Sequence, residues 1–392
     1  MIREGDVYLN NVFSEPIYVT RPLLPDIKKI NTKMTEIWES KWLTNNGKQH
    51  KELESHLKNY LNVEQISLFN NGTLALLLGL KSLNLQGEII TTPFTFPATV
   101  QALDWNGLTP VFCDIDPITL NIDANKIEAL ITEHTSAILG VHVFGNPCDV
   151  EKIQSIADKY NLKVIYDGAH AFGAKIDGKP ISSFGDMTMF SFHATKLFNS
   201  VEGGALTFRD EELINRLDLL KNFGLAGPET VVLSGLNAKM NEVQAGIGLE
   251  VLKIIEEERA KRNIIKKTYE KYLADIPGIR VLTNLENDRS SYQYFVIEID
   301  ECKYGMSRDL VHKKLEKYNV FTRKYFYPLC SDFQWYNHLE SAQPENLPQA
   351  QKSVRQVLSM PYYGELDVIS VEKICAILMK LHTLTQQVST EN

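Results

Sequence analysis

The stretch MFSFHATKLFNSVEGGALTF, residues 189–208, places a lysine between two short apolar runs. The runs Met187 to Phe192 and Gly204 to Phe208 predict buried strands because they are largely apolar. Lys196 follows the first strand, where its amine is positioned to become a nucleophile that forms a Schiff base. The alternative is a solvated lysine, the usual state of this residue type. The stretch therefore predicts a strand edge with a candidate reactive amine.

Five apolar runs upstream predict the other strands of the same sheet. Helix-length segments separate most of them, and this alternation favours an open, mostly parallel sheet with helices on both faces. With the two runs above they predict an α/β fold with a seven-stranded sheet. The five runs are 66–69, 88–92, 110–113, 137–143 and 163–166.

Turn signals and helical spacing divide the chain into domains. After a lead-in of residues 1–25, a large domain is expected over 26–250; it begins with two helices within 26–61 that flank a turn at 44–47. One long helix over about 240–275 is expected to link it to a smaller α+β domain, residues 251–392. The smaller domain is expected to contain a strand at 292–299, helices at 307–317, 349–358 and 369–384, and an extended piece at 320–327.

The composition excludes several classes of protein. The 392 residues are 44% apolar and 23% charged, which is typical of a globular protein of two or three domains. The net charge of -8 argues against nucleic acid as a main partner. The five cysteines are scattered without CxxC spacing, which is typical of reduced thiols. Neither a signal peptide nor a membrane span is expected from the sequence, so we predict a cytoplasmic protein.

Two motifs lie where predicted strands end. Asn71, Gly72 and Thr73 open a helix whose free N–H groups suit a phosphate, although they also suit a plain capped turn. Asp167 ends the strand 163–166 at the carboxyl edge of the sheet, where ligands of such sheets bind. Its carboxylate either holds a protonated ring nitrogen or caps the next turn.

The phosphate turn, the strand-end acid and a Ser-x4-Lys spacing occur in this order along one predicted domain. Together they describe a site for pyridoxal phosphate (PLP). The competing interpretation, a metal site made of the acid and nearby histidines, matches no metal-ligand spacing, and no metal is expected. The phosphate is expected on Asn71, Gly72, Thr73 and Ser191, the ring nitrogen on Asp167, and the aldehyde carbon on Lys196.

The sequence resembles the nucleotide-sugar aminotransferases of the DegT/StrS family, which are fold-type I PLP enzymes. The resemblance implies a large domain with a seven-stranded, mostly parallel sheet and a smaller C-terminal α+β domain. It covers about residues 22–381 and is carried by NNGTLAL, TTPFTFPAT, VHVFGNPCD, VIYDGAHAFGA, FSFHATKLFNSVEGG, GLNAKMNEVQAGIGLE and VLSMPYY.

The resemblance implies a role for each site residue. Lys196 would hold PLP and then move protons as general base and acid, and Asp167 would keep the pyridine nitrogen protonated. Phe96 would stack on the ring, or else be a core aromatic, and His170 would sit near the phenolic oxygen. Asn237 would reach the phosphate from the neighbouring subunit, which implies a homodimer.

The resemblance also implies the substrates. An amino group would pass from L-glutamate to a keto-sugar nucleotide, and the wording of FSFHATK and EGG favours a dTDP-4-keto-6-deoxyglucose 4-aminotransferase. Products of such enzymes usually feed surface polysaccharide, such as the O-antigen of lipopolysaccharide. Candidate contacts for the sugar and its diphosphate are Arg323, Lys324, Tyr325 and Tyr327, with an amphipathic strand of solvated cations as the alternative.

Three other functions compete with this prediction. The first is a 3-aminotransferase of a 3-keto-6-deoxyhexose nucleotide. The second is the related PLP-dependent sugar dehydratase branch, which carries histidine in place of the Schiff-base lysine; the presence of Lys196 favours transamination. The third is a non-catalytic regulator that keeps the fold, against which Lys196 and Asp167 both argue.

Overall fold

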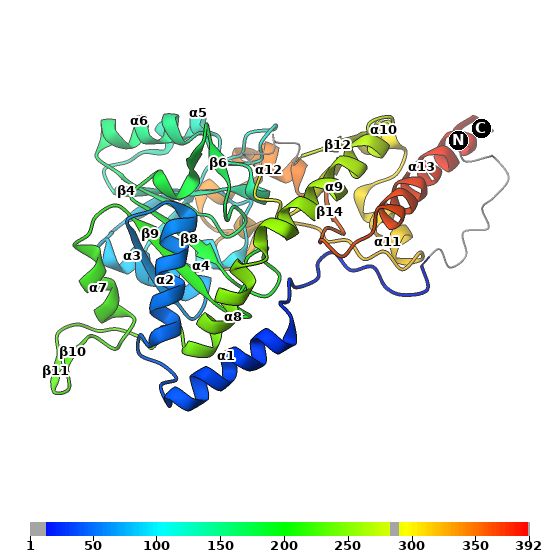
Figure 1. The fold of residues 1–392 in the computed structure, drawn as a ribbon. Helices are drawn as coiled ribbons and strands as arrows, with labels where there is room; N and C mark the ends of the chain where they lie inside the picture. The colour runs from blue at the N-terminus through cyan, green and yellow to red at the C-terminus, as the bar shows by residue number, and fades with distance from the viewer. Residues whose placement is uncertain (1–12, 283–289, 391–392) are drawn as a thin grey trace.

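The structure is a computed structural model that describes residues 13–282 and 290–390, and its largest element is a seven-stranded sheet (Figure 1). The strand order is β1-β9-β8-β5-β4-β2-β3. Strand β9 runs antiparallel to both of its neighbours, and the other pairs are parallel. The predicted α/β fold is therefore confirmed. The strands are β1 (Gln65–Phe69), β2 (Glu88–Thr91), β3 (Thr109–Phe112), β4 (Thr135–Val141), β5 (Lys163–Asp167), β8 (Met187–Ser191) and β9 (Gly204–Phe208).

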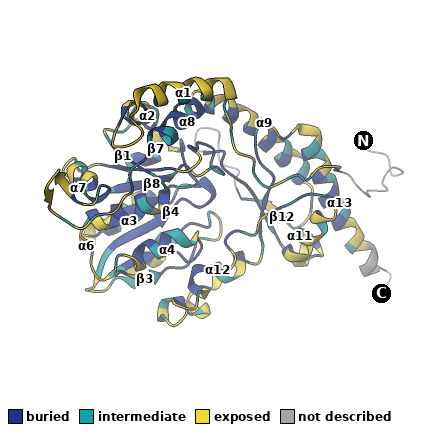
Figure 2. Ribbon diagram, turned by 90° about the horizontal axis from the view of Figure 1, so that it is seen from below, coloured by how far each residue is buried: buried dark blue, intermediate teal, exposed yellow. Residues whose placement is uncertain are grey.

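Helices cover both faces of this sheet, so its strands are buried (Figure 2). Successive side chains of a strand point to opposite faces: Ile165 packs in the cluster with α3, α4 and α7, and Val164 and Tyr166 pack in the cluster with α5 and α6. This explains why the strands read as continuous apolar runs. The helices are α1 (Ile27–Ser40), α2 (Lys48–Leu61), α3 (Gly72–Ser82), α4 (Pro97–Asp104), α5 (Ala124–Ile127), α6 (Val150–Tyr160) and α7 (Leu213–Leu220).

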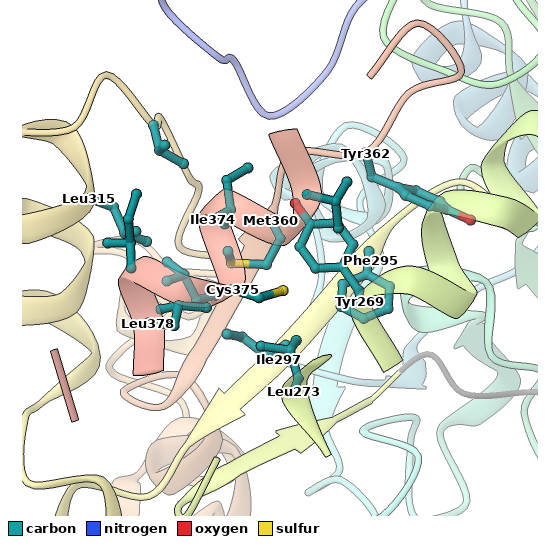
Figure 3. Packing of buried hydrophobic residues seen from close by; sticks show 14 of the residues in the cluster. Tyr269, Leu273, Phe295, Ile297, Leu315, Met360, Tyr362, Ile374, Cys375 and Leu378 are labelled. Atoms are coloured by element: carbon teal, nitrogen blue, oxygen red, sulfur yellow. The ribbon is translucent and has the colours of Figure 1, made fainter. Parts of the chain in front are cut away.

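A second, antiparallel sheet has the order β12-β13-β14 and packs under three helices. Figure 3 shows its apolar core, to which α9 (Ile255–Leu273), α11 and α13 contribute. The elements are β12 (Ile279–Val281), β13 (Phe295–Ile299), α10 (Glu301–Tyr304), α11 (Arg308–Glu316), α12 (Pro348–Ser353), β14 (Val357–Met360) and α13 (Val368–Thr390). Two short hairpins complete the fold: β6 (Lys175–Ile176) with β7 (Lys179–Pro180), and β10 (Leu225–Gly227) with β11 (Thr230–Val231).

The prediction of one long helix over 240–275 is wrong. The segment forms α8 (Glu242–Leu252) and α9 (Ile255–Leu273), and Ile254 between them has non-helical angles, φ -113° and ψ 3°. The first turn of α9 carries Glu256, Glu257 and Glu258, and negative charges stabilise a helix N-terminus. The run of acids therefore supports a new helix start where the apolar spacing alone predicts continuity.

Two predictions for the C-terminal region also need correction. The helix expected over 349–358 ends at Ser353, and the residues from Val357 form β14, because they pair with β13 and are fully buried. The extended piece 320–327 forms no strand and touches its neighbours through isolated bridges, Val320 with Ile17 and Arg323 with Ser359. Tertiary pairing decides both outcomes.

Residues 1–12 of the predicted lead-in lie outside the described residues. From residue 13 the lead-in joins the C-terminal core, since Phe13 is buried there and Ile17 pairs with Val320. The domain boundary near residue 250 stays a prediction. Among the described helices, none has the length and apolar character needed to cross a membrane.

Candidate active site

The carboxyl ends of the central strands open into a cavity of about 980 Å³. Loops after β1, β2, β5 and β8 line one side of it, and residues of the C-terminal region line the other. Eleven of the thirteen predicted site residues lie on this cavity. They are Asn71, Gly72, Thr73, Phe96, Asp167, His170, Ser191, Lys196, Asn237, Arg323 and Tyr325.

The start of α3 forms a tight cradle at the end of β1. The Asn71 side chain caps this helix by accepting a hydrogen bond from the Leu74 N–H at 2.8 Å. A Cβ atom on Gly72 would lie 2.9 Å from Ser191 Cβ, so only glycine lets the helix start approach β8 this closely. The capped turn and the candidate anion site are thus the same structure, with a helix N-terminus facing the cavity.

Asp167 is held at the end of β5 by two donors. Its Oδ1 accepts a hydrogen bond from the Ala169 N–H at 2.9 Å, and its Oδ2 accepts one from Thr99 Oγ1 at 2.7 Å. Burial raises the pKa of this carboxyl, while the two hydrogen bonds and the charge of Lys196 oppose that shift. Asp167 therefore caps the next turn and also faces the cavity, which combines the two roles considered from the sequence.

Lys196 lies in the loop that follows β8, with its amine 5.8 Å from the centroid of the Tyr294 ring. Burial lowers the pKa of this amine, and Arg323 contributes in the same direction. Gln293 fixes the backbone on both sides of it: Oε1 accepts the Leu197 N–H at 2.5 Å, and Nε2 donates to the Thr195 carbonyl at 3.0 Å. A partly buried lysine with a lowered pKa suits nucleophilic chemistry better than a solvated one.

His170 is buried between aromatic rings. It stacks on Phe326, with ring centroids 5.7 Å apart, and meets the edge of Tyr294 at 4.8 Å. Burial lowers the pKa of its imidazole well below the ordinary value, so the ring is neutral. Within the described part of the chain its Nδ1 is buried and has no hydrogen-bond partner.

Two of the predicted substrate contacts do not reach the cavity. Lys324 forms an ion pair with Asp309 at 3.2 Å, and the Tyr327 ring is 56% exposed with the Lys324 amine 5.1 Å from its centroid. Neighbouring residues of an extended chain point to opposite sides, so Lys324 turns away where Arg323 and Tyr325 face inward. The Arg323 guanidinium lies 4.6 Å from the centroid of the Tyr325 ring.

Phe96 and Asn237 are the remaining predicted residues. Phe96 is 50% exposed and lines the cavity, so the alternative of a core aromatic is wrong; its neighbour Phe94 takes that place. Asn237 lies on the cavity of its own chain, and its contribution across a subunit boundary stays a prediction.

Comparison with known proteins decides the class of this site. Residues 25–379 match the family described as the DegT/DnrJ/EryC1/StrS aminotransferase family. The chain belongs to this family. It is therefore an aminotransferase, and the predicted resemblance, fold and enzyme class are confirmed.

Three relatives illustrate the similarity of this aminotransferase to known proteins. The dTDP-4-amino-4,6-dideoxy-D-glucose transaminase of Escherichia coli is 46% identical, covering 93% of this chain and 98% of the relative. The protein of the same name from Shigella dysenteriae is 42% identical, covering 94% and 99%. The crystal structure of DesI in the presence of its TDP-sugar product has a TM-score of 0.90 at 35% identity, covering 97% of this chain and 96% of that one.

Sequence reasoning missed several residues of the aminotransferase site. Thr99 lies inside the motif TTPFTFPAT, so a motif-wide inspection could have found it. Gln293 and Tyr294 carry no such signal, because their contacts reach across about a hundred residues of chain. In the described ranges, no group of three His, Cys, Asp or Glu side chains could hold a metal ion.

Proposed function

We propose that this aminotransferase uses PLP to transfer the amino group of L-glutamate to a dTDP-linked 4-keto-6-deoxyhexose. The observation that carries the proposal is the meeting of Lys196 and Asp167 on one buried cavity at the carboxyl edge of the sheet. A reactive amine and a buried carboxylate at this edge are the two groups that a pyridoxal ring requires.

Four features of the cavity fit PLP. The cradle between Gly72 and Ser191 suits the phosphate, and it admits no side chain at residue 72. His170 lines the cavity, as the predicted contact with the phenolic oxygen requires. The half-exposed ring of Phe96 suits stacking on the pyridine. Asp167 keeps an acceptor for the ring nitrogen, because each of its oxygens receives one protein donor and can accept a second.

The chain's own residues divide the chemical work. When bound, PLP supplies the electron sink that stabilises negative charge on the amino-bearing carbon. Lys196, whose pKa is lowered by burial, supplies the amine that attaches the cofactor and later accepts and returns a proton. Asp167 holds a proton on the ring nitrogen, and His170 stays neutral. Asn71, Gly72, Thr73 and Ser191 hold the phosphate.

The acceptor is proposed from the relatives and from the cavity wall. Both curated relatives described above are named for dTDP-4-amino-4,6-dideoxy-D-glucose, which favours a 4-amino product over the 3-aminotransferase alternative. Arg323 offers a cation for an anionic group of substrate, and the Tyr325 ring offers a face for the sugar. The intact Lys196 argues against the dehydratase, and the presence of both Lys196 and Asp167 on one cavity argues against a regulator without turnover.

We infer that the active unit is a homodimer. Large apolar side chains are exposed on and after α1, such as Trp38 and Trp42, and near the β10-β11 hairpin, such as Phe223 and Val231. Large exposed apolar surfaces favour a protein partner. Asn237, which lines the cavity, pairs with Asn222 next to Phe223. A second copy of the chain is the partner that the resemblance implies.

The reaction is tested with the purified chain, PLP, L-glutamate and dTDP-4-keto-6-deoxyglucose. We expect 2-oxoglutarate and a dTDP-4-amino sugar in equal amounts, and visible absorbance from the lysine-bound cofactor. Lys196→Ala should abolish both product and absorbance. A panel of 3-keto and 4-keto sugar nucleotides tests the acceptor, and turnover restricted to 3-keto sugars would overturn the 4-amino assignment.

The shared site is tested by mixing two inactive variants. Lys196→Ala and Asn237→Ala each damage a different part of the site, so a mixed dimer with a site that crosses the subunit boundary contains one intact site. We expect activity to return when the two variants are unfolded and refolded together. A monomer in light scattering, or no recovery in a mixture that forms dimers, would refute the shared site.

A further inference from the structure

A chain of hydrogen bonds between buried side chains ends on Asp167. Thr99 Oγ1 lies 2.7 Å from Asp167 Oδ2, and Thr95 Oγ1 lies 2.8 Å from Thr99 Oγ1. Thr99 and Thr95 are buried, at 0% and 1% exposure, and Thr95 also lines the cavity. Neither threonine is among the residues that the sequence assigns to the cofactor or the substrate.

The direction of these hydrogen bonds follows from the carboxylate. An ionised Asp167 can only accept, so Thr99 donates its single hydroxyl hydrogen to it. The hydrogen between the two hydroxyls must then come from Thr95. The hydrogen bonds therefore run in one direction, from Thr95 to Thr99 to Asp167. The reverse direction would leave a buried carboxylate oxygen of Asp167 without the Thr99 donor.

The backbone around both threonines is fixed. Thr99 lies in the first turn of α4, and its N–H donates to the Phe96 carbonyl at 3.1 Å. The Thr95 carbonyl accepts from Cys330 Sγ at 3.4 Å, and the Cys330 N–H donates to the Pro93 carbonyl at 3.0 Å. The loop that carries Thr95 and Phe96 is thus anchored by a segment more than two hundred residues away.

We propose that Thr99 is a positioning residue for Asp167, and that Thr95 orients the Thr99 hydroxyl. Thr99 occupies one lone pair of Oδ2, as Ala169 occupies one of Oδ1, which fixes the plane of the carboxylate and directs its remaining lone pairs into the cavity. The inference rests on the proposed function, in which Asp167 holds the ring nitrogen of PLP. Lys196 is the charged group that faces Asp167 from a neighbouring loop.

The test compares Thr99→Val, which keeps the shape and removes the hydroxyl, with Thr99→Ser, which keeps the hydroxyl. In the apoprotein labelled with ¹³C-aspartate, the Asp167 carboxyl signal is identified by its loss in Asp167→Asn and followed through a pH titration. We expect Asp167 to titrate at higher pH in Thr99→Val and at the wild-type pH in Thr99→Ser. With PLP bound, kcat should fall about tenfold or more in Thr99→Val and recover in Thr99→Ser.

Two controls separate positioning from general damage to the core. Thr188→Val makes the same change on the adjacent strand β8, where the hydroxyl is buried and has no partner in the described structure. Thr91→Val removes a buried hydrogen bond to the Leu139 carbonyl that does not involve Asp167. Both should leave the Asp167 titration unchanged.

The result has clear alternatives. If Thr99→Val does not fold, Thr95→Val takes its place and should shift the Asp167 titration in the same direction by a smaller amount. A wild-type titration in a folded Thr99→Val protein, or an equal shift in Thr188→Val, would overturn the inference. If the wild-type chain binds no PLP, the proposed function fails, whereas the apoprotein titration still decides the role of Thr99.

Discussion

Replacing Gln293 should remove the hydrogen bonds that hold the backbone on both sides of Lys196 in place. Its amide is buried and bonds both neighbours of Lys196, the Leu197 N–H at 2.5 Å and the Thr195 carbonyl at 3.0 Å. Gln293→Leu leaves the buried Leu197 N–H without a partner and removes the partly buried bond to the Thr195 carbonyl. The first costs about 1–3 kcal/mol and the second about 0.5–1.5 kcal/mol, so the free energy of unfolding should fall by roughly 1.5–4.5 kcal/mol.

The activity should fall as well, because the amine is no longer held in one position. Displacement of a reacting group by about 1 Å costs on the order of a hundredfold in rate. Gln293→Glu gives an intermediate case: its carboxylate accepts from Leu197 but cannot donate to Thr195.

Urea denaturation measures the stability of these variants, and single-turnover reaction with L-glutamate measures the rate. Gln343→Leu is a matched control, since this partly exposed glutamine also bonds two backbone carbonyls, those of Asn337 and Leu339, outside the site. We expect the control to lose less than about 1 kcal/mol, because water replaces its bonds. Wild-type stability and rate in Gln293→Leu would refute the reasoning.

Four further predictions test the site and the core. Asp167→Asn should lower the transamination rate by orders of magnitude with the fold intact by circular dichroism, since a neutral amide does not hold a ring proton; an unchanged rate contradicts its role. Gly72→Ala should destabilise the chain by about 1–3 kcal/mol and weaken PLP binding in an equilibrium titration, because the added Cβ would lie 2.9 Å from a side-chain carbon of β8. Arg323→Ala should raise KM for a substrate at least tenfold, while Lys324→Ala, which lies outside the cavity, should leave every KM within about twofold in steady-state assays. Burial lowers the pKa of His50 from 6.5 to about 4, so between these pH values the unfolded chain binds a proton that the folded chain does not. The free energy of unfolding should therefore fall by up to about 3 kcal/mol as the pH falls from 6.5 to 4. Urea titrations at both pH values should show a smaller fall in His50→Gln.

The strands and the mostly parallel character of the sheet were predictable from the sequence because they depend on local apolar runs and on the helix-length segments between them. Strands buried on both faces are apolar throughout, and helix-length segments between them leave few other topologies. The errors occur where contacts between residues far apart in the sequence decide the secondary structure. Val357 to Met360 become a strand because β13 lies beside them, and the chain breaks at Ile254 although its apolar spacing continues.

The same distinction applies to the site. Residues that follow a strand, such as Asp167 and Lys196, could be placed at the sheet edge from their position alone. The hydrogen bonds of Thr99 and Gln293 join residues 68 and 96 positions apart. Thr99 lies within the motif TTPFTFPAT, whereas no local pattern marks Gln293. The inward turn of Arg323 and the outward turn of Lys324 likewise depend on how the 323–327 segment lies against the rest of the fold.

The reversed direction of β9 has a consequence for how such a site can diversify. Ser191 pairs with Gly204, and Gly204 pairs with Phe69, so the segment bearing Lys196 leaves and rejoins the sheet at a single rung, next to the start of α3. Both ends of that segment are therefore held at the same point of the sheet, which fixes the position of the Lys196 amine relative to the start of α3. Substitutions along the opposite wall of the cavity can then change which sugars fit, without moving the reactive amine.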